Sequence, residues 1–189
     1  MKVRDSGMPE ENYWETFFNP PYILSQLQLD NTIKDVAEFG SGYGTFTLQA
    51  AKIIKGKLHA FDIEPEMISI LKDKLSKEKI SNVKVYHADF VKEETKLKDE
   101  SIDYAMLFNI LHAKDPVSLL REVYRILIHK GKVGIIHWIY SDATPRGPSL
   151  DIRPKPEQCI EWLKQAGFKL GSEVIQLPPY HYGIVGIKT

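Results

Sequence analysis

The sequence predicts an α/β fold: a doubly wound, mostly parallel sheet of seven strands with one antiparallel strand near the C-terminus. Five strand-like apolar segments alternate with segments whose apolar residues recur at helical spacing. Residues 102–108 are nearly continuously apolar, as expected of a central strand that is buried on both faces. Residues 168–177 and 182–187 suit two strands with no helix between them, which makes one of the pair antiparallel.

The expected elements follow one another in a regular order. The strands of the parallel part are expected at 35–39, 57–61, 83–87, 102–108 and 133–139. The helices are expected at 13–18, 22–27, 45–51, 66–77, 117–128 and 157–165. Pro65 suits the first turn of the helix at 66–77, and Gly167 stops the last helix. Residues 91–100 and 141–156 are expected to be loops, and residues 130–132 a turn.

The bulk composition is that of one ordinary globular domain. The chain has 189 residues and a formal net charge of zero, from 25 basic and 25 acidic side chains. That balance gives no bulk attraction to nucleic acid or to an anionic membrane. The single Cys159 cannot form an internal disulfide, and no apolar run is long enough to span a bilayer. A cytoplasmic location is expected.

A glycine-rich stretch follows the first expected strand. Gly40, Gly42 and Gly44 stand at alternate positions, and Glu38 precedes them by two residues. Strand, tight turn and helix N-terminus bring backbone N–H groups and a helix dipole close to a bound ligand. The pattern departs from the dinucleotide fingerprint at Thr45, where that fingerprint has its third glycine. The pattern resembles motif I of the class I S-adenosylmethionine (SAM) dependent methyltransferases. From this stretch alone SAM, a dinucleotide or no ligand at all remain open.

Polar residues close the later strands, at the sheet edge where such folds bind ligands. Asp62 ends the second strand, 20 positions after Gly42, and can accept both hydroxyls of a ribose; it also suits a helix cap. Asp89 ends the third strand; the family resemblance implies that it accepts a hydrogen bond from an adenine amino group, and otherwise it is a solvated turn residue. His112 follows the fourth strand, with the pKa range of a general base, or it packs beside the next helix.

Three segments together carry a resemblance to a known family. The E-x-G-x-G-x-G pattern at 38–44 resembles motif I of class I SAM-dependent methyltransferases. Residues 103–112 resemble motif IV of that family, and residues 120–132 resemble the helix and turn that follow it. The chain is similar to the type 11, quinone-biosynthesis-like group, over most of its length. The resemblance implies the Rossmann-like class I fold, EC class 2.1.1.-, SAM as cofactor and S-adenosyl-L-homocysteine (SAH) as product.

The resemblance also implies roles for individual residues. His112 would lie near the transferred methyl group. The cofactor would be bound by Glu38, Gly40, Ser41, Gly42, Tyr43, Gly44, Asp62, Ile63, Met67, Ala88, Asp89, Phe90, Asn109 and Leu111. No metal is expected. The core at 35–139 would hold the cofactor within a single domain, 1–189. The arm and helix at 1–30 would form a lid, and residues 140–189 the acceptor side.

The acceptor is expected to be a small molecule, because no basic tail or appended nucleic-acid module is evident. Its candidate contacts are aromatic residues and one arginine, each of which also suits ordinary packing: Trp14, Phe18, Trp138, Arg146 and Tyr180. Rival functions are a protein or RNA methyltransferase of the same fold and an NAD-binding oxidoreductase. The oligomeric state, monomer or homodimer, stays open.

One further motif is judged by its position. The stretch at 19–22 reads N-P-P-Y, the active-site tetrad of methyltransferases that act on amide or exocyclic nitrogens. In those enzymes the tetrad follows the fourth strand, whereas here it precedes the first. The sequence therefore favours a helix start, with Pro20 and Pro21 in the first turn.

Overall fold

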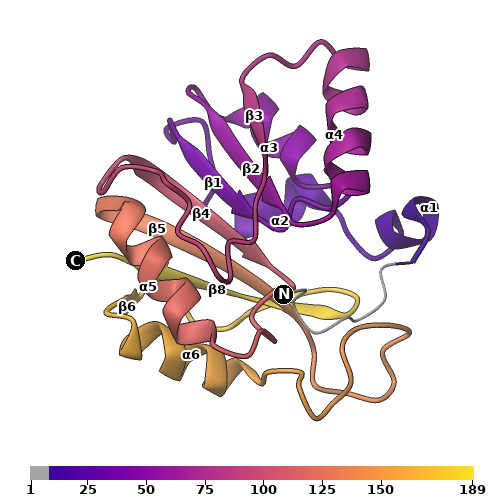
Figure 1. The fold of residues 1–189 in the computed structure, drawn as a ribbon. Coiled ribbons are helices and arrows are strands. Elements are labelled where there is room, and N and C mark those ends of the chain that lie inside the picture. The colour runs from indigo at the N-terminus through magenta and orange to yellow at the C-terminus, as the bar shows by residue number, and fades with distance from the viewer. Residues whose placement is uncertain (1–8) are drawn as a thin grey trace.

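The computed structural model describes residues 9–189, and Figure 1 shows one twisted sheet with helices packed on both of its faces. The first eight residues of the expected N-terminal lid lie outside the described residues. The strands are β1 Val36–Phe39, β2 Leu58–Asp62, β3 Val83–His87, β4 Ile102–Phe108, β5 Leu127–Trp138, β6 Lys169–Leu170, β7 Ile175–Leu177 and β8 His181–Ile187. The helices are α1 Glu11–Glu15, α2 Pro20–Gln26, α3 Thr47–Ile53, α4 Pro65–Lys77, α5 Pro116–Ile126 and α6 Pro156–Gln165.

The sheet has the predicted doubly wound topology. Its strand order is β3-β2-β1-β4-β5-β8-β6, and β7 also pairs with β8. Strands β1 to β5 are mutually parallel, and β8 runs antiparallel to β5. The short strands β6 and β7 both pair with β8, so together they fill the seventh position of the sheet. The predicted fold class, a mostly parallel seven-stranded sheet with an antiparallel C-terminal strand, is confirmed.

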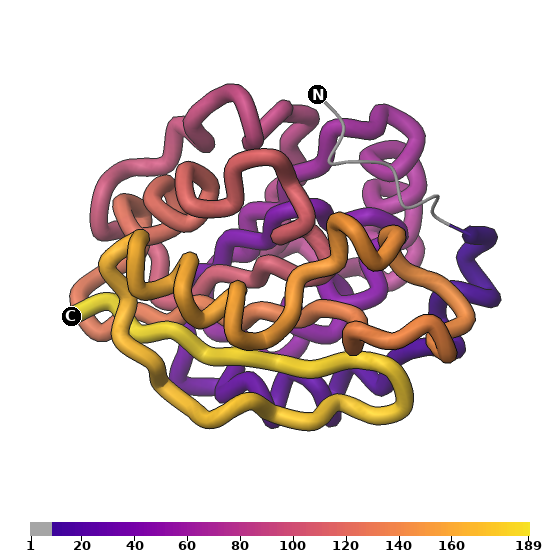
Figure 2. Tube along the Cα trace, turned by 90° about the horizontal axis from the view of Figure 1, so that it is seen from below, coloured from indigo at the N-terminus to yellow at the C-terminus, as the bar shows by residue number. Residues whose placement is uncertain are grey.

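Two apolar cores lie on opposite faces of the sheet, because successive side chains of a strand point to opposite sides. Ala105 and Leu107 of β4 pack with apolar residues of α5 and α6, whereas Tyr104 and Met106 pack with those of α2, α3 and α4. The β4 strand is buried on both faces, as its apolar run predicts. Figure 2 shows α6 lying beside β8, which it contacts. No helix within residues 9–189 is both long and apolar enough to cross a membrane.

Four helices begin with proline, whose fixed φ suits a first helical turn: α2, α4, α5 and α6. At α2 the side chain of Asn19 accepts a hydrogen bond from the Tyr22 N–H, at 3.3 Å. The N-P-P-Y stretch is therefore a capped helix start, as its position predicts. Asp115 caps α5 in the same way, accepting from the Ser118 N–H at 2.9 Å.

The turn predicted at 130–132 is wrong. Strand β5 begins at Leu127 and continues through these residues, and α5 ends at Ile126 instead of continuing to residue 128. The extra residues form a bulge against β4, where the pairing register shifts. Lys130 has a φ of 64°, and its N–H donates to the Lys188 carbonyl at 2.9 Å. The Lys188 N–H in turn donates to the Gly131 carbonyl, so the bulge stays hydrogen-bonded to the chain beyond β8.

Candidate active site

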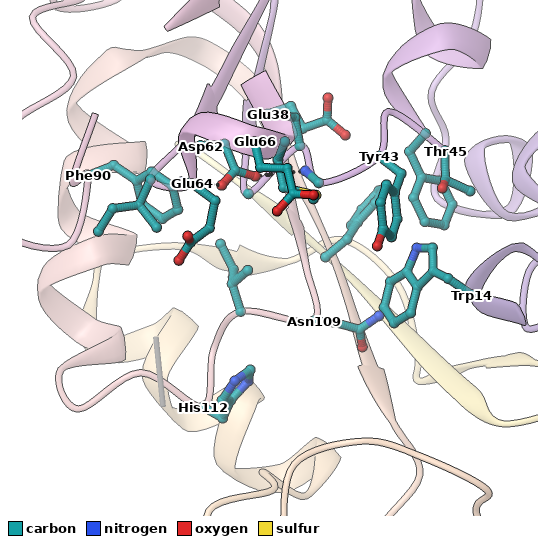
Figure 3. A pocket seen from close by; sticks show the side chains of 18 of the residues that line it. Trp14, Glu38, Tyr43, Thr45, Asp62, Glu64, Glu66, Phe90, Asn109 and His112 are labelled. Atoms are coloured by element: carbon teal, nitrogen blue, oxygen red, sulfur yellow. Dashed lines mark hydrogen bonds between the residues drawn. The ribbon is translucent and has the colours of Figure 1, made fainter. Parts of the chain in front are cut away.

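A cavity of about 500 Å³ opens beyond the carboxyl ends of β1 and β4, the neighbouring strands at which the strand order reverses. Figure 3 shows its side chains, which come from β1 and the glycine turn, the ends of β2, β4 and β5, the segment after β3, and the N-terminal helix α1. The lining consists of Trp14, Glu38, Gly40, Ser41, Gly42, Tyr43, Thr45, Phe46, Asp62, Ile63, Glu64, Glu66, Met67, Phe90, Phe108, Asn109, Ile110, His112 and Trp138.

The glycine turn forms one wall of this cavity. Gly40 has a φ of +81°, and a Cβ on it would lie 3.0 Å from the Ile110 side chain. Its N–H donates to the Phe61 carbonyl at 2.8 Å, which fixes the turn to the end of β2. Gly44 has a φ of +83°, but a Cβ there would meet Leu71 of α4 at 2.7 Å. Gly44 therefore allows the turn to pack closely on α4, while Gly40 and Gly42 face the cavity.

Asp62 joins the glycine turn to the start of α4. Its Oδ2 accepts the Gly42 N–H at 2.7 Å and its Oδ1 accepts the Glu64 N–H at 3.0 Å. Burial raises the pKa of this carboxyl, while the backbone donors oppose that rise. Each carboxylate oxygen has a second lone pair. Asp62 can thus brace the loop and still accept hydrogen bonds from a ligand in the cavity.

Glu38 is the second carboxyl of the cavity and is only 3 % exposed. The Thr47 hydroxyl donates to its Oε2 at 2.5 Å. Burial, with a smaller contribution from the nearby Asp62, raises the pKa of Glu38 to about 8. The free site therefore holds Glu38 mainly protonated at neutral pH, and a cationic group bound beside it would favour its ionised form.

The end of β4 supplies polar groups to the opposite wall. Asn109 has a φ of 58°, and neither its Nδ2 nor its Oδ1 has a protein partner. Figure 3 shows this amide among the side chains that line the cavity. His112 is buried, and its Nδ1 lies 3.3 Å from Nε2 of His137 on β5. Burial holds the pKa of His137 well below its usual range, so His137 is a neutral partner for His112.

Comparison with known proteins identifies this arrangement. A family model described as a methyltransferase domain matches residues 36–131, which is half of the chain and contains the glycine turn. The chain belongs to the methyltransferase-domain family. Its structure is similar to that of a SAM-dependent methyltransferase from Aquifex aeolicus, with a TM-score of 0.84 and 23% identity over 95% of this chain and 94% of that one. The predicted class I methyltransferase fold is confirmed.

Three other relatives extend the likeness. A type 11 methyltransferase structure from Sulfolobus solfataricus has a TM-score of 0.70 and 26% identity, covering 92% of this chain and 94% of that one. The Arabidopsis thaliana chloroplastic 2-methyl-6-phytyl-1,4-hydroquinone methyltransferase is 31% identical over 77% of this chain and 43% of its own length. An uncharacterised methyltransferase-like protein of Schizosaccharomyces pombe is 27% identical over 66% of this chain and 45% of its own. The chain spans less than half the length of these two curated relatives.

Most of the cofactor residues expected from the sequence line the cavity of this methyltransferase domain, but four do not: Gly44, Ala88, Asp89 and Leu111. Asp89 lies 3.5 Å from the Lys92 ammonium, although the adjacent Phe90 does line the cavity. Leu111 is fully buried and lines a second cavity, whereas Ile110 takes the place expected for it.

The expected acceptor contacts divide in a similar way. Trp14 and Trp138 line the cavity, and their ring centroids are 6.5 Å apart. Phe18 and Tyr180 pack against this wall from outside. The ring centroids of Phe18 and Trp14 are 4.8 Å apart, and those of Tyr180 and Trp138, which are stacked, are 6.2 Å apart. Arg146 lies in the loop after β5 and lines neither of the two described cavities.

Several lining residues escaped the sequence reasoning: Thr45, Phe46, Glu64, Glu66, Phe108 and Ile110. Each of them lies close in the sequence to a residue already assigned to the glycine turn, the end of β2 or the end of β4. That proximity could have identified them. His137 gave no such signal, because it reaches His112 only through the pairing of β4 with β5.

Proposed function

We propose that this domain transfers a methyl group from SAM to a small-molecule acceptor and releases SAH. One observation carries the proposal. The carboxyls of Glu38 and Asp62 and the backbone of the glycine turn line one cavity at the point where the strand order reverses. Membership of the methyltransferase-domain family supports SAM as the donor. The division into a lid at 1–30, a cofactor core at 35–139 and an acceptor side at 140–189 is part of the proposal.

The donor set fits an adenosyl amino acid. Asp62 would accept the ribose hydroxyls, and Glu38 would bind the methionine ammonium, which supplies the positive charge that its buried carboxyl lacks. Met67 and Phe90 give apolar surface beside Ile63, where the adenine ring would lie. The unpartnered amide of Asn109 would meet the polar end of the amino acid. These contacts position the donor and exclude water from it.

Little further chemistry is demanded of the protein. When bound, SAM would supply a methyl group to an electron pair of the acceptor that attacks in line, as the carbon–sulfur bond breaks and its electrons return to sulfur. The acceptor then has a proton to lose. His112 lines the cavity beyond Asn109 and would receive that proton, with His137 holding the orientation of its ring through the 3.3 Å contact.

A small acceptor suits the aromatic wall that Trp14 and Trp138 give this cavity. The hydroquinone in the name of the Arabidopsis relative belongs to this class of molecule and supports the proposal. The net charge of zero gives no general attraction to RNA or DNA. We also propose a cytoplasmic location, which a single free and buried cysteine would suit.

Isothermal titration with SAM, SAH and NAD tests the donor site. SAM and SAH are expected to bind, and NAD is not. Asp62→Asn should weaken the binding of SAM and SAH. Asp73→Asn, which changes an exposed acid on α4, should bind both as the parent chain does. Tight NAD binding without SAM binding would overturn the proposal. Labelled SAM supplied to a cell extract, divided into protein, RNA and small-molecule fractions, would then locate the acceptor. Label confined to protein or RNA would contradict a small-molecule acceptor.

A further inference from the structure

A second cavity, of about 570 Å³, lies on the other side of His112. It is bounded by the chain after β4, the loop after β5 and the start of α6. Its lining consists of Leu111, His112, Ala113, Lys114, Pro116, Val117, Tyr140, Leu150, Asp151, Ile152, Arg153, Pro154, Lys155, Gln158 and Trp162. His112 is the one residue that lines both described cavities. A molecule in the second cavity would therefore meet the imidazole that borders the proposed donor site.

The charges around this second cavity are mostly positive. Lys114, Arg153 and Lys155 line it, and among the described residues Asp151 is the only acidic one in its lining. The Lys155 ammonium is held 4.6 Å from the centroid of the Tyr140 ring, a cation–π contact that keeps the charge at the wall. This excess contrasts with the chain as a whole, whose net charge is zero.

Arg153 places a buried positive charge at the wall of this cavity. It is only 7 % exposed, and its hydrogen bonds go to neutral oxygens, among them the carbonyls of Pro148 at 2.9 Å and Ile139 at 3.0 Å. Within residues 9–189 no carboxylate forms an ion pair with it. Buried charges are normally paired, because carbonyl oxygens compensate only part of the lost hydration. Its Nη2 makes one long contact, of 3.4 Å to the Arg146 carbonyl, and so retains donor capacity.

The groups behind Arg153 do not offer that anion either. His137 and His181 are the buried ionisable side chains whose pKa Arg153 lowers, and burial is the main cause of the lowering at both. Neither is an acid. No cluster of histidine, cysteine and acidic residues suited to a metal occurs in the described part of the chain. Within the described residues, this end of the sheet thus carries a buried positive charge that no carboxylate pairs with and no metal cluster accompanies.

We propose that the second cavity binds an anionic group of the methyl acceptor, a carboxylate or a phosphate. Lys114 and Lys155 attract the anion at the mouth of the cavity, and the buried charge of Arg153 stabilises it inside. The reacting atom of the same acceptor then lies past His112, toward the donor. This inference deepens the proposed function and rests on it, since it names the class of acceptor that the methyltransferase takes.

The test uses the full chain, labelled with ¹⁵N and saturated with SAH. Benzoate and phenyl phosphate are titrated as anionic probes and benzamide as the neutral probe, while the amide signals of Lys114, Lys155 and Gln158 are followed. Saturable shifts at these amides are expected with both anions, or with the one whose geometry fits. Their affinity should exceed that of benzamide about tenfold, as a charged hydrogen bond gives.

Charge-removing variants locate the binding. Lys114→Met and Lys155→Met should each lower the affinity for the anion by up to about fivefold, which is the range measured for partly exposed charge pairs. Lys164→Met, an exposed lysine of α6 that lines neither cavity, serves as the matched control and should change nothing. Arg153→Lys keeps the charge and should bind the anion, whereas Arg153→Met should not, with folding of both checked by circular dichroism.

The proposal of an anionic acceptor would be overturned by equal affinities for benzamide and the anions. It would also be overturned if Lys164→Met lost as much anion affinity as Lys114→Met and Lys155→Met. Binding of SAH is measured in the same samples and reports the proposed function separately. Failure to bind SAH would contradict the assignment of the first cavity to the methyl donor. SAH binding without anion selectivity would contradict only the assignment of the second cavity to an anionic group.

Discussion

The buried Glu38 makes the free protein's stability depend on pH in a direction opposite to that of most carboxyls. In the unfolded chain its pKa is near 4.5, and in the folded domain burial raises it to about 8. Below the unfolded pKa both states hold the proton. Between the two values the unfolded state has released it while the folded state keeps it, so the free energy of unfolding falls as pH rises.

The size of the effect follows from the interval between the two pKa values. Each pH unit corresponds to about 1.4 kcal/mol for one proton, so the interval from 4.5 to about 8 corresponds to about 5 kcal/mol. Glu38→Gln keeps an oxygen that accepts the Thr47 hydroxyl but has no proton to lose. The variant should therefore gain stability over the parent chain by about this amount at alkaline pH, and by almost nothing in mild acid.

Urea unfolding of both chains, without ligand, at about pH 5 and about pH 8 measures the difference. Glu157→Gln, which removes an exposed acid from the first turn of α6, is the control and should follow the parent chain. Parallel pH profiles for Glu38→Gln and the parent would show that Glu38 does not hold a proton in the folded state. The reasoning about its burial would then be refuted.

Three further variants test separate parts of the account. Asp62→Asn should lower the affinity for SAH by about tenfold to about a hundredfold, because it removes a charged hydrogen-bond acceptor. An unchanged Kd in calorimetry would exclude the contact between Asp62 and the ribose. His112→Asn should lower kcat by about a hundredfold or more once an acceptor is known, with SAH affinity kept; an unchanged kcat would assign His112 to packing. Gly44→Ala places a Cβ 2.7 Å from Leu71 at a φ of +83° and should cost about 1–3 kcal/mol in urea unfolding. Equal stability would show that α4 yields to the new side chain.

The strand-end acids were accessible from the sequence because a parallel sheet brings the carboxyl ends of its strands to one edge. Asp62 and His112 were found by locating where apolar segments stop, and Glu38 by its position two residues before the glycine turn; all three line the same cavity. The N-P-P-Y stretch was interpreted correctly for a related reason, because its position before β1 excludes the strand end at which a catalytic tetrad would lie.

Other features depend on tertiary contacts that no local pattern encodes. Asn109 adopts a φ of 58°, which breaks the strand alternation and turns Ile110, not Leu111, toward the first cavity. The bulge in β5 exists because Lys130 and Gly131 find partners at Lys188, far along the chain. The local pattern Lys-Gly-Lys favours a turn. These residues form a bulged strand instead because the last strand lies where it can hydrogen-bond them.

The second cavity illustrates the same limit. Arg153 lies in a segment that the sequence marks only as a loop, and its buried position follows from carbonyls that the folded loop presents to it. Arg146 was the acceptor contact expected from this loop, and it lines neither described cavity. The structure places Arg153, seven residues later, at a cavity wall instead.

The most direct measurement of the central claim is the affinity of the unmodified chain for SAH, with NAD as the competing ligand and Asp62→Asn as the matched variant. We expect one SAH per chain, a large loss of affinity in the variant and no displacement by NAD. SAH binding that the variant leaves unchanged, or displacement by NAD, would contradict the assignment of this cavity to the methyl donor.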